Sequence, residues 1–378
     1  MDDQNQSQPQ IEITIDAPND TEQPHREPLI IIRRSSSLIL TKFHGGHFRI
    51  SLSLCSQALL WKTLGDPIDD AHAFQRVLSM LPSNAFLFLW SLAFFTLISQ
   101  SLLYILRCFF RFEMVKNEFF HHVGVNYLFA PWISWLLLLQ SSRLIAPTTI
   151  YYQVFWCASV LPIVVLDVKI YGQWFTKGPW LLSTMANPAS QLSVIGNFVG
   201  ARAAAQMGWR ECALFLFSLG MTHYLVLFVT LYQRLSGSSS LPVMLRPVFF
   251  LFIATPSIAS LAWESIAGNF DVSSKMLFFL ALFLFMSLVC RPALFKRSMR
   301  KFNVAWWAYP FPLTVLALAA TKYAQEVRGA RAHALMLLLS AVSVLASLAL
   351  IIVTAITSNN IFSQSPKRTL LKIPNPPA

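Results

Sequence analysis

The sequence predicts an all-α integral membrane protein, and three observations support this class. Of the 378 residues, 55% are hydrophobic and only 12% are charged, whereas a soluble domain has about 25% charged residues. Ten apolar segments follow one another, each close to the ~20 residues that a helix needs to cross a bilayer. Proline and glycine interrupt several of them, and broken backbone inside a membrane must face protein or water. We therefore expect ten transmembrane helices around an internal cavity.

The chain divides into three parts. Residues 1–46 are polar and predict a disordered cytoplasmic tail, residues 47–358 form the channel-like helical part, and residues 359–378 form a short cytoplasmic C-terminal tail. An amphipathic link at 111–124 is expected to lie at the membrane interface. The predicted helices span about 47–64, 84–110, 125–142, 149–171, 187–206, 209–233, 246–263, 273–290, 303–324 and 334–358.

The basic residues predict the orientation of the helices. With the N-terminus inside, 20 of the 29 lysines and arginines lie on the cytoplasmic side and 9 on the other side. The positive-inside rule then places both termini of this multi-pass protein in the cytoplasm. The net charge of +12 fits loops that face anionic lipid. No basic patch is interleaved with stacking aromatic residues, so we do not expect nucleic-acid binding.

Helix breakers alternate along the chain. The third, fifth, seventh and ninth segments contain them, whereas the second, eighth and tenth have no internal proline; the fourth departs from the pattern with Pro162. Bent helices must be shielded from lipid. The pattern predicts five helical hairpins around a central pore, with an inner ring of bent helices and an outer ring of straighter ones. The alternative is that prolines are simply common in transmembrane helices.

The inner segments carry small polar side chains but no ladder of carboxylates. The missing carboxylates argue against a proton-driven transporter and favour passive flow, and hydroxyl and amide groups bind an anion weakly enough for conduction. The Asn187-Pro188 pair is also a good helix start. The candidate pore-lining or kink residues are Ser53, Ser56, Pro131, Asn187, Pro188, Ser193, Asn197, Gly200, Pro256, Ser257, Pro310, Pro312 and Thr314.

Few residues of the chain have a type and spacing that would suit catalysis or metal binding. There is no nucleotide-binding loop, catalytic-serine motif or zinc-protease motif, so we expect neither enzymatic activity nor a cofactor or metal. Four charged residues lie near helix ends, and most of them are expected to snorkel to the interface; the four are Asp167, Lys169, Arg202 and Glu264. The five cysteines lack CxxC spacing and should be free thiols. Ser36, after two arginines, is a candidate site for a protein kinase.

The segment Trp306–Pro312 has the most unusual composition. It holds four aromatic rings and two prolines in seven positions, and the last of these rings, Phe311, stands between Pro310 and Pro312. A proline inside a helix bends it, so we expect Phe311 to face the cavity.

Nine short segments of the chain resemble the plant slow-type (S-type) anion channel family; bacterial tellurite-resistance and C4-dicarboxylate transporters are more distant relatives. Four examples are Glu118–His121, Phe129–Trp132, Lys169–Trp174 and Ala305–Tyr309. The resemblance implies ten helices in five quasi-fivefold hairpins and a trimer with one pore per protomer. It also implies passage of chloride and nitrate across the plasma membrane, with Phe311 as the gate.

Three departures from the family pattern leave the function open. Arg49 and Ser53 replace glycines of the first helix, Pro310 replaces a threonine before the gate, and the tails are short. The first hypothesis is an anion channel gated by a phenylalanine plug. The second is a poorly conducting modulatory subunit that assembles with longer-tailed homologues. The third is a malate transporter of the C4-dicarboxylate class.

Overall fold

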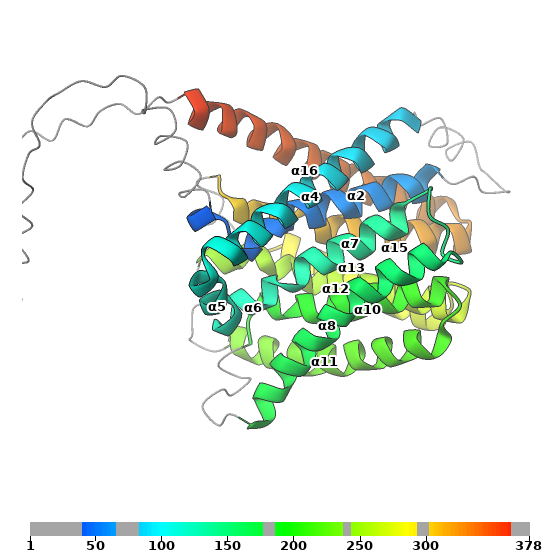
Figure 1. Cartoon of the computed structure of the whole chain (residues 1–378). Helices are drawn as coiled ribbons and strands as arrows, with labels where there is room; N and C mark the ends of the chain where they lie inside the picture. Colours follow the sequence, from blue (N-terminus) through cyan, green and yellow to red (C-terminus); the bar gives the residue numbers. More distant parts are fainter. Residues whose placement is uncertain (1–39, 66–82, 177–185, 237–242, 293–301, 364–378) are drawn as a thin grey trace, which may run out of the picture.

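The structure, a computed structural model, describes residues 40–65, 83–176, 186–236, 243–292 and 302–363, and these contain helices and no strands (Figure 1). Ser36 and the two ends of the chain lie outside the described residues. Phe43, Gly45 and Gly46, which precede the predicted boundary at residue 47, are buried. The α-helices are α2 (Arg49–Gly65), α4 (Ser83–Phe110), α5 (Phe112–Phe120), α6 (Gly124–Tyr127), α7 (Phe129–Ser141), α8 (Ile150–Thr176), α10 (Gln191–Gln206), α11 (Arg210–Ser236), α12 (Leu251–Ala267), α13 (Val272–Val289), α15 (Pro310–Val327) and α16 (Ala330–Ser363).

Seven helices of the described part are long and apolar enough to cross a membrane, which confirms the all-α membrane class. They are α4, α8, α11, α12, α13, α15 and α16. An eighth candidate joins α5 to the α6–α7 segment across a bend of 104°. The helices α2 and α10 lie where two further spans were predicted, but they are not among these candidates. Ten membrane-crossing helices therefore stay a prediction.

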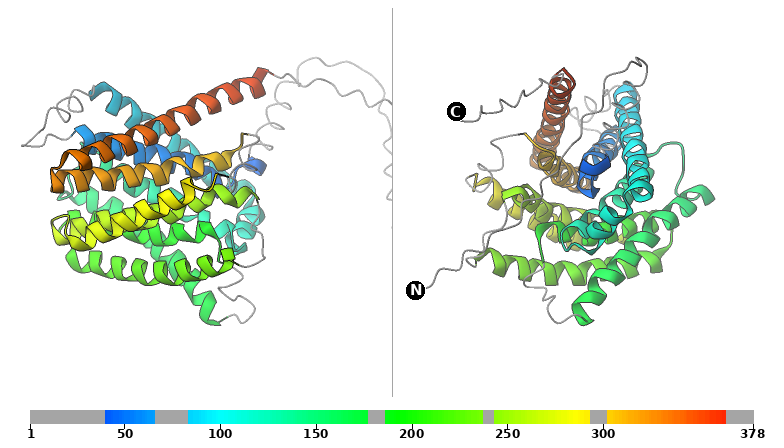
Figure 2. Two further views of the ribbon diagram at one scale, coloured as in Figure 1. Left: turned by 180° about the vertical axis from the view of Figure 1, so that it is seen from behind. Right: turned by 60° about the vertical axis from the view of Figure 1, so that its left-hand side comes forward.

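Five helices form a closed inner ring. The helices α2, α7, α10, α12 and α15 each contact the next in this order, and α15 contacts α2 again. Each inner helix also packs on the helix that follows it, which gives the hairpins α2–α4, α7–α8, α10–α11, α12–α13 and α15–α16. In the right-hand view of Figure 2, the inner helix α2 (blue) lies between the outer helices α4 (cyan) and α16 (red). The predicted hairpins and the division into inner and outer rings are thus confirmed.

Burial separates the two rings. In an apolar stretch of 18 residues within the candidate spans of α12 and α15, 72% and 89% of the residues are buried, whereas the corresponding stretches of the outer helices range from 17% to 44%. The outer helices expose large apolar side chains such as Phe95, Phe155 and Phe283. Since no water competes for apolar groups inside a bilayer, such surfaces are stable against lipid tails. The inner ring is built from smaller residues, which allow its helices to approach closely.

The predicted bends are mostly helix beginnings. Pro131 lies in the first turn of α7, Pro188 opens a 3-10 turn before α10, and Pro310 and Pro312 lie in the first turn of α15. There the missing backbone N–H is not needed, so the proline starts a helix instead of bending it. Of the candidates, only Pro256 lies inside a described helix, α12. Pro162 lies inside the outer helix α8, so an internal proline does not by itself mark the inner ring.

Each inner helix begins with a short separate turn. Four of these turns are 3-10 helices, namely η1 (Gly45–Phe48), η2 (Pro188–Ser190), η3 (Val243–Phe250) and η4 (Val304–Ala308), and the fifth is α6. The side chains of His44, Asn187 and Asn303 cap three of them by accepting a backbone N–H two residues later. Capping satisfies donors that a helix start leaves unpaired. We call each inner helix together with its first turn an inner unit. The break in the helix therefore lies at the N-terminal end of each inner unit.

Candidate functional site

A small cavity lies where the first turns of the inner helices meet. Its volume is about 10 Å³, which is room for about one water molecule. Phe311 borders it and is only 1% exposed. All five inner units contribute to its wall, through Arg49, Leu52, Tyr127, Leu192, Val248, Leu251, Trp307, Ala308 and Phe311. Because the wall comes from every inner unit, the cavity lies on the axis of the ring, and the axis is nearly filled at this level.

The chain around Phe311 is held on several sides. Asn303 caps η4 through the N–H of Ala305 at 2.8 Å, and Ser53 of α2 donates to the carbonyl of Trp307 at 3.1 Å. The indole N–H of Trp307 bonds to Thr354 of α16 at 3.1 Å. These contacts and the fixed φ of Pro310 hold the backbone in place. The backbone next to Phe311 is therefore fixed by its neighbours, whereas the apolar side chain of Phe311 itself has no group that a hydrogen bond could restrain.

Arg49 adds a positive charge to the cavity wall. Its guanidinium carbon lies 4.4 Å from the centre of the Tyr127 ring, a cation–π distance, and Nε has no hydrogen-bond acceptor within the described chain. The N-termini of the surrounding helices also present partial positive charge. This level of the axis thus favours an anion over a cation.

Most of the predicted pore-lining polar groups bond between helices. Gln57 of α2 is the centre of one cluster, with Nε2 at 2.9 Å from Thr314 Oγ1 and at 2.7 and 2.8 Å from the hydroxyls of Ser343 and Ser347. Ser193 bonds to the Tyr171 hydroxyl of α8 at 2.7 Å. Such bonds replace the water that a membrane interior lacks. These groups join the inner helices to their neighbours.

The remaining candidates serve packing or their own helix. Ser56 and Ser257 donate to carbonyls of α2 and α12. A Cβ atom at Gly200 would lie 3.2 Å from Leu216 and Val160, and the carbonyl of Gly200 accepts from Trp156. Small size at this position lets α8 and α11 approach α10 closely.

Two charged residues do not snorkel as predicted. Asp167 is 1% exposed and accepts a hydrogen bond of 2.7 Å from Asn197 of α10, because α8 turns it toward the inner ring. Arg202 is 5% exposed and donates to Gln140 of α7 at 3.0 Å. The sequence showed that both lie near helix ends, but it could not show which face of the helix they occupy. Lys169, by contrast, lies over the Phe119 ring.

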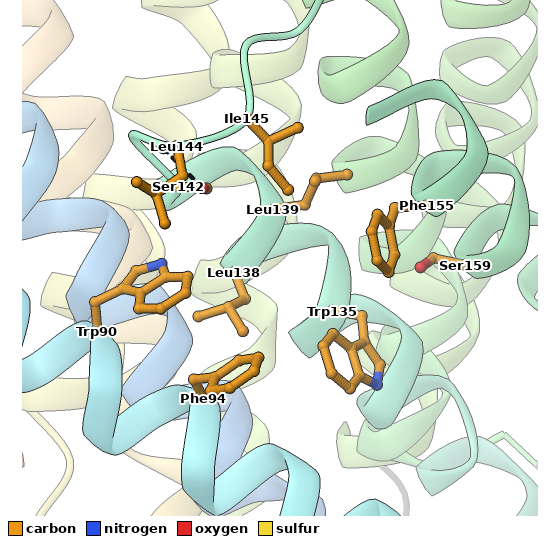
Figure 3. A pocket seen from close by; sticks show the side chains of 10 residues that line it. All are labelled: Trp90, Phe94, Trp135, Leu138, Leu139, Ser142, Leu144, Ile145, Phe155 and Ser159. Carbon is orange, nitrogen blue, oxygen red and sulfur yellow. Dashed lines mark hydrogen bonds between the residues drawn. The ribbon is translucent and has the colours of Figure 1, made fainter. Parts of the chain in front are cut away.

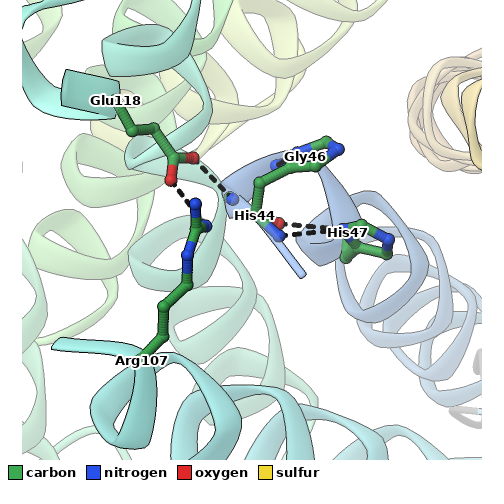
Figure 4. A network of polar contacts seen from close by, with 6 residues as sticks. His44, Gly46, His47, Arg107 and Glu118 are labelled. Atoms are coloured by element: carbon green, nitrogen blue, oxygen red, sulfur yellow. Dashed lines mark hydrogen bonds and ion pairs between the residues drawn. The ribbon is translucent and has the colours of Figure 1, made fainter. Parts of the chain in front are cut away.

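A polar network fastens the start of the first inner unit (Figure 4). Glu118 of α5 accepts from the N–H of Gly45 at 2.6 Å and pairs with Arg107 of α4 at 2.9 Å. His44 accepts from the N–H of Gly46 at 3.1 Å. Both partners of the ion pair are largely buried, so the network is a rigid attachment of η1 to α4 and α5.

A second pocket, of about 150 Å³, lies between α4, α7 and α8 (Figure 3). Its wall is almost entirely apolar and includes Trp90, Phe94 and Trp135. It has no charged group that could bind an anion, and its residues differ from those around Phe311. In the part of the chain that the structure describes, the five cysteines are free, as predicted, and no group of residues could hold a metal ion.

Comparison with known proteins identifies relatives over almost the whole helical part. The profile of the voltage-dependent anion channel family matches residues 42–357. The S-type anion channels SLAH1 and SLAH4 of Arabidopsis thaliana are 57% and 55% identical to the chain, over 327 and 335 residues. These matches cover 86% and 89% of this chain and 84% and 88% of the relatives. A tellurite resistance protein TehA homolog of Haemophilus influenzae is 25% identical over 284 residues, 74% of this chain and 80% of that protein.

Proposed function

The chain belongs to the voltage-dependent anion channel family, and from this premise we propose that it passes chloride and nitrate across the plasma membrane. The observation that carries the proposal is the cavity on the ring axis, whose wall comes from all five inner units and includes Phe311. A closed ring with one narrow, electropositive level fits passive conduction, since channels need weak binding along an open path. Phe311 is the gate in this proposal.

The proposal includes the membrane arrangement and the assembly. Ten helices cross the membrane, both termini are cytoplasmic, and the first turns of the inner helices face the cytoplasm. Three protomers assemble, each with its own pore, or the chain joins homologues in a mixed trimer. Ser36 is the proposed phosphorylation site, since added negative charge beside two arginines would change how the N-terminal segment interacts.

The gate is tested by replacing Phe311 with alanine. Rotating an aromatic ring off its rotamer costs roughly 0.5–1.5 kcal/mol, and about 1.4 kcal/mol corresponds to a tenfold change in an equilibrium. We therefore expect Phe311→Ala to raise the anion current about tenfold in voltage-clamped oocytes, measured in chloride and in nitrate. The wild type and the variant must be compared at equal surface expression.

Phe278→Ala is the matched control for this experiment. Phe278 is a fully buried phenylalanine of the outer helix α13, where it packs on Tyr323. Its removal creates a cavity of similar chemistry away from the axis. An unchanged current in a well-expressed Phe311→Ala protein, or an equal rise in both variants, would contradict the gate.

A modulatory subunit is the second candidate, favoured by how tightly the gate segment is held. Ser53 bonds to the carbonyl of Trp307, and the Trp307 indole bonds to Thr354. Pro310 also fixes the first turn of α15. Such a segment fits a chain that stays closed by itself and conducts or regulates only beside a homologue. Co-expression separates the candidates: current that requires a longer-tailed partner supports the subunit, and large current from the chain alone supports the channel.

A further inference from the structure

Arg202 is a buried cation that forms no ion pair within 4.0 Å with the described residues. The three ion pairs within 4.0 Å in that part of the chain join Arg107 to Glu118, Lys116 to Glu113 and Lys322 to Glu264. Glu264, whose charge reaches Arg202, is thus already paired with Lys322. An unpaired cation inside a membrane protein lowers its stability. An ionisable residue at such a position therefore indicates a function.

The Arg202 side chain starts on the inward face of α10. Ser193, on the same helix, bonds to Tyr171 of the outer helix α8 and so marks the outward face. Arg202 follows nine residues later, and at 3.6 residues per turn this is about two and a half turns. It therefore leaves the helix on the opposite side, toward the interior of the ring, where Gln140 of the neighbouring inner helix accepts its hydrogen bond.

Arg202 also lies well beyond the Phe311 cavity. Leu192 of α10 borders that cavity, and Arg202 is ten residues further along the helix. At 1.5 Å per residue, the two levels are about 15 Å apart along the axis. The guanidinium thus stands on the side of Phe311 away from the first turns of the inner helices.

One edge of the guanidinium is not used by the hydrogen bond to Gln140. The hydrogen bond that Arg202 makes to the described residues runs from Nη1 to Gln140 Oε1, at 3.0 Å, and Nε has no acceptor there. Gln140 is itself fixed, because its amide nitrogen donates to the carbonyl of Val199 at 3.2 Å. The Nε–H and the adjacent Nη2–H point in parallel, which is the arrangement that binds a planar oxyanion through two bonds at once.

We propose that the Nε–Nη2 edge of Arg202 binds one permeating anion, and that it holds planar nitrate more tightly than spherical chloride. This inference rests on the proposed conduction of anions along the ring axis. Lys62 of α2 bonds to the carbonyls of Gln140 and Ser142 and brings a second positive charge to the same end of α7.

The first test measures binding without conduction. The purified full-length protein in detergent is heated in sodium nitrate, sodium chloride or sodium gluconate at equal ionic strength. A ligand that binds only the folded state raises the unfolding temperature, so nitrate should raise it more than chloride does. Arg202→Lys keeps the positive charge but removes the pair of parallel N–H donors. Losing one charge-assisted hydrogen bond should weaken nitrate binding about tenfold. Arg202→Gln should abolish the difference between the salts.

Arg210→Gln is the matched control, because Arg210 is an exposed arginine at the start of α11, close in sequence to Arg202. It should keep the full nitrate effect. A wild type without a nitrate-specific rise, or an Arg202→Lys protein with the same rise as wild type, overturns the proposal. If Arg202→Gln does not fold, the lysine variant still decides between these results.

The second test separates this inference from the proposed function. On the Phe311→Ala background, reversal potentials give the permeability of nitrate relative to chloride. We expect Arg202→Lys to lower this ratio, and Arg210→Gln to leave it unchanged. If Phe311→Ala conducts and Arg202→Lys keeps the permeability ratio, the proposed anion site at Arg202 is contradicted, whereas the proposed anion conduction is supported. If Phe311→Ala does not conduct but nitrate still stabilises the protein through Arg202, the proposed conduction is contradicted, whereas the proposed anion site is supported.

Discussion

Replacing Gln57 with leucine should loosen the contact between the first inner helix and the last hairpin. The amide nitrogen of Gln57 reaches the hydroxyls of Thr314, Ser343 and Ser347 at 2.7–2.9 Å, and the side chain is 2% exposed. Leucine has a similar volume, so the change removes hydrogen bonds without leaving a large cavity. The cluster therefore offers a direct measure of what polar contacts contribute to this fold.

The expected magnitude follows from the geometry. The amide nitrogen has two hydrogens and so makes two good hydrogen bonds at a time, and a hydrogen bond between membrane helices contributes about 0.6 kcal/mol on average and up to about 1.7. Thr314 and Ser343 still bond to each other at 2.9 Å after the change, so their hydroxyls keep a partner. We expect a loss of about 1–2 kcal/mol, or roughly 1–3 °C in unfolding temperature for a chain of this length.

Thermal unfolding of the purified protein in detergent measures the effect, with Gln233→Leu as the control. Gln233 is an exposed glutamine near the end of α11, and its replacement should change little. A double variant with Thr314→Val should lose less than the sum of the two single changes, because the residues share a bond. An unchanged unfolding temperature for Gln57→Leu, or strictly additive losses, would refute the reasoning.

Two further predictions concern the network that attaches η1. Gly45→Ala should lower the unfolding temperature, because the added Cβ would lie 2.8 Å from Glu118 Oε1; Gly172→Ala, where nothing lies within 4 Å, should not, and equal effects would contradict the steric argument. Partial burial, and then the charges of neighbouring basic groups, lower the pKa of His44 from 6.5 to about 4. Below about pH 6.5 the unfolded chain binds a proton on His44, whereas the folded chain does not bind it until about pH 4. The free energy of unfolding therefore falls as the pH drops from 6.5 toward 4, and His44 does not change it above pH 6.5. The effect should be small because part of the ring faces solvent. His44→Gln should make the unfolding temperature less sensitive to pH in this range, and an unaltered pH profile would show that His44 does not contribute.

The sequence by itself determined the class of the protein and its pairing of helices. Apolar segments of bilayer length and the scarcity of charge are properties of the chain alone, because a helix in lipid must satisfy its own backbone. The placement of breakers and small polar residues also predicted which helices form the inner ring, although Pro162 inside the outer helix α8 shows that a proline alone does not mark an inner helix. The structure agrees: α12 and α15 are mostly buried and the outer helices expose phenylalanines to the surroundings.

Only the tertiary structure decided where individual side chains point. Sequence position placed Ser193, Asn197 and Thr314 on inner helices but could not show that they bond to neighbouring helices, because that depends on the rotation of each helix about its axis. For the same reason Arg202 was expected at the interface and is buried. Phe311 differs, because the flanking prolines constrain the backbone locally. Its position at a cavity bordered by all five inner units nevertheless required the closed ring.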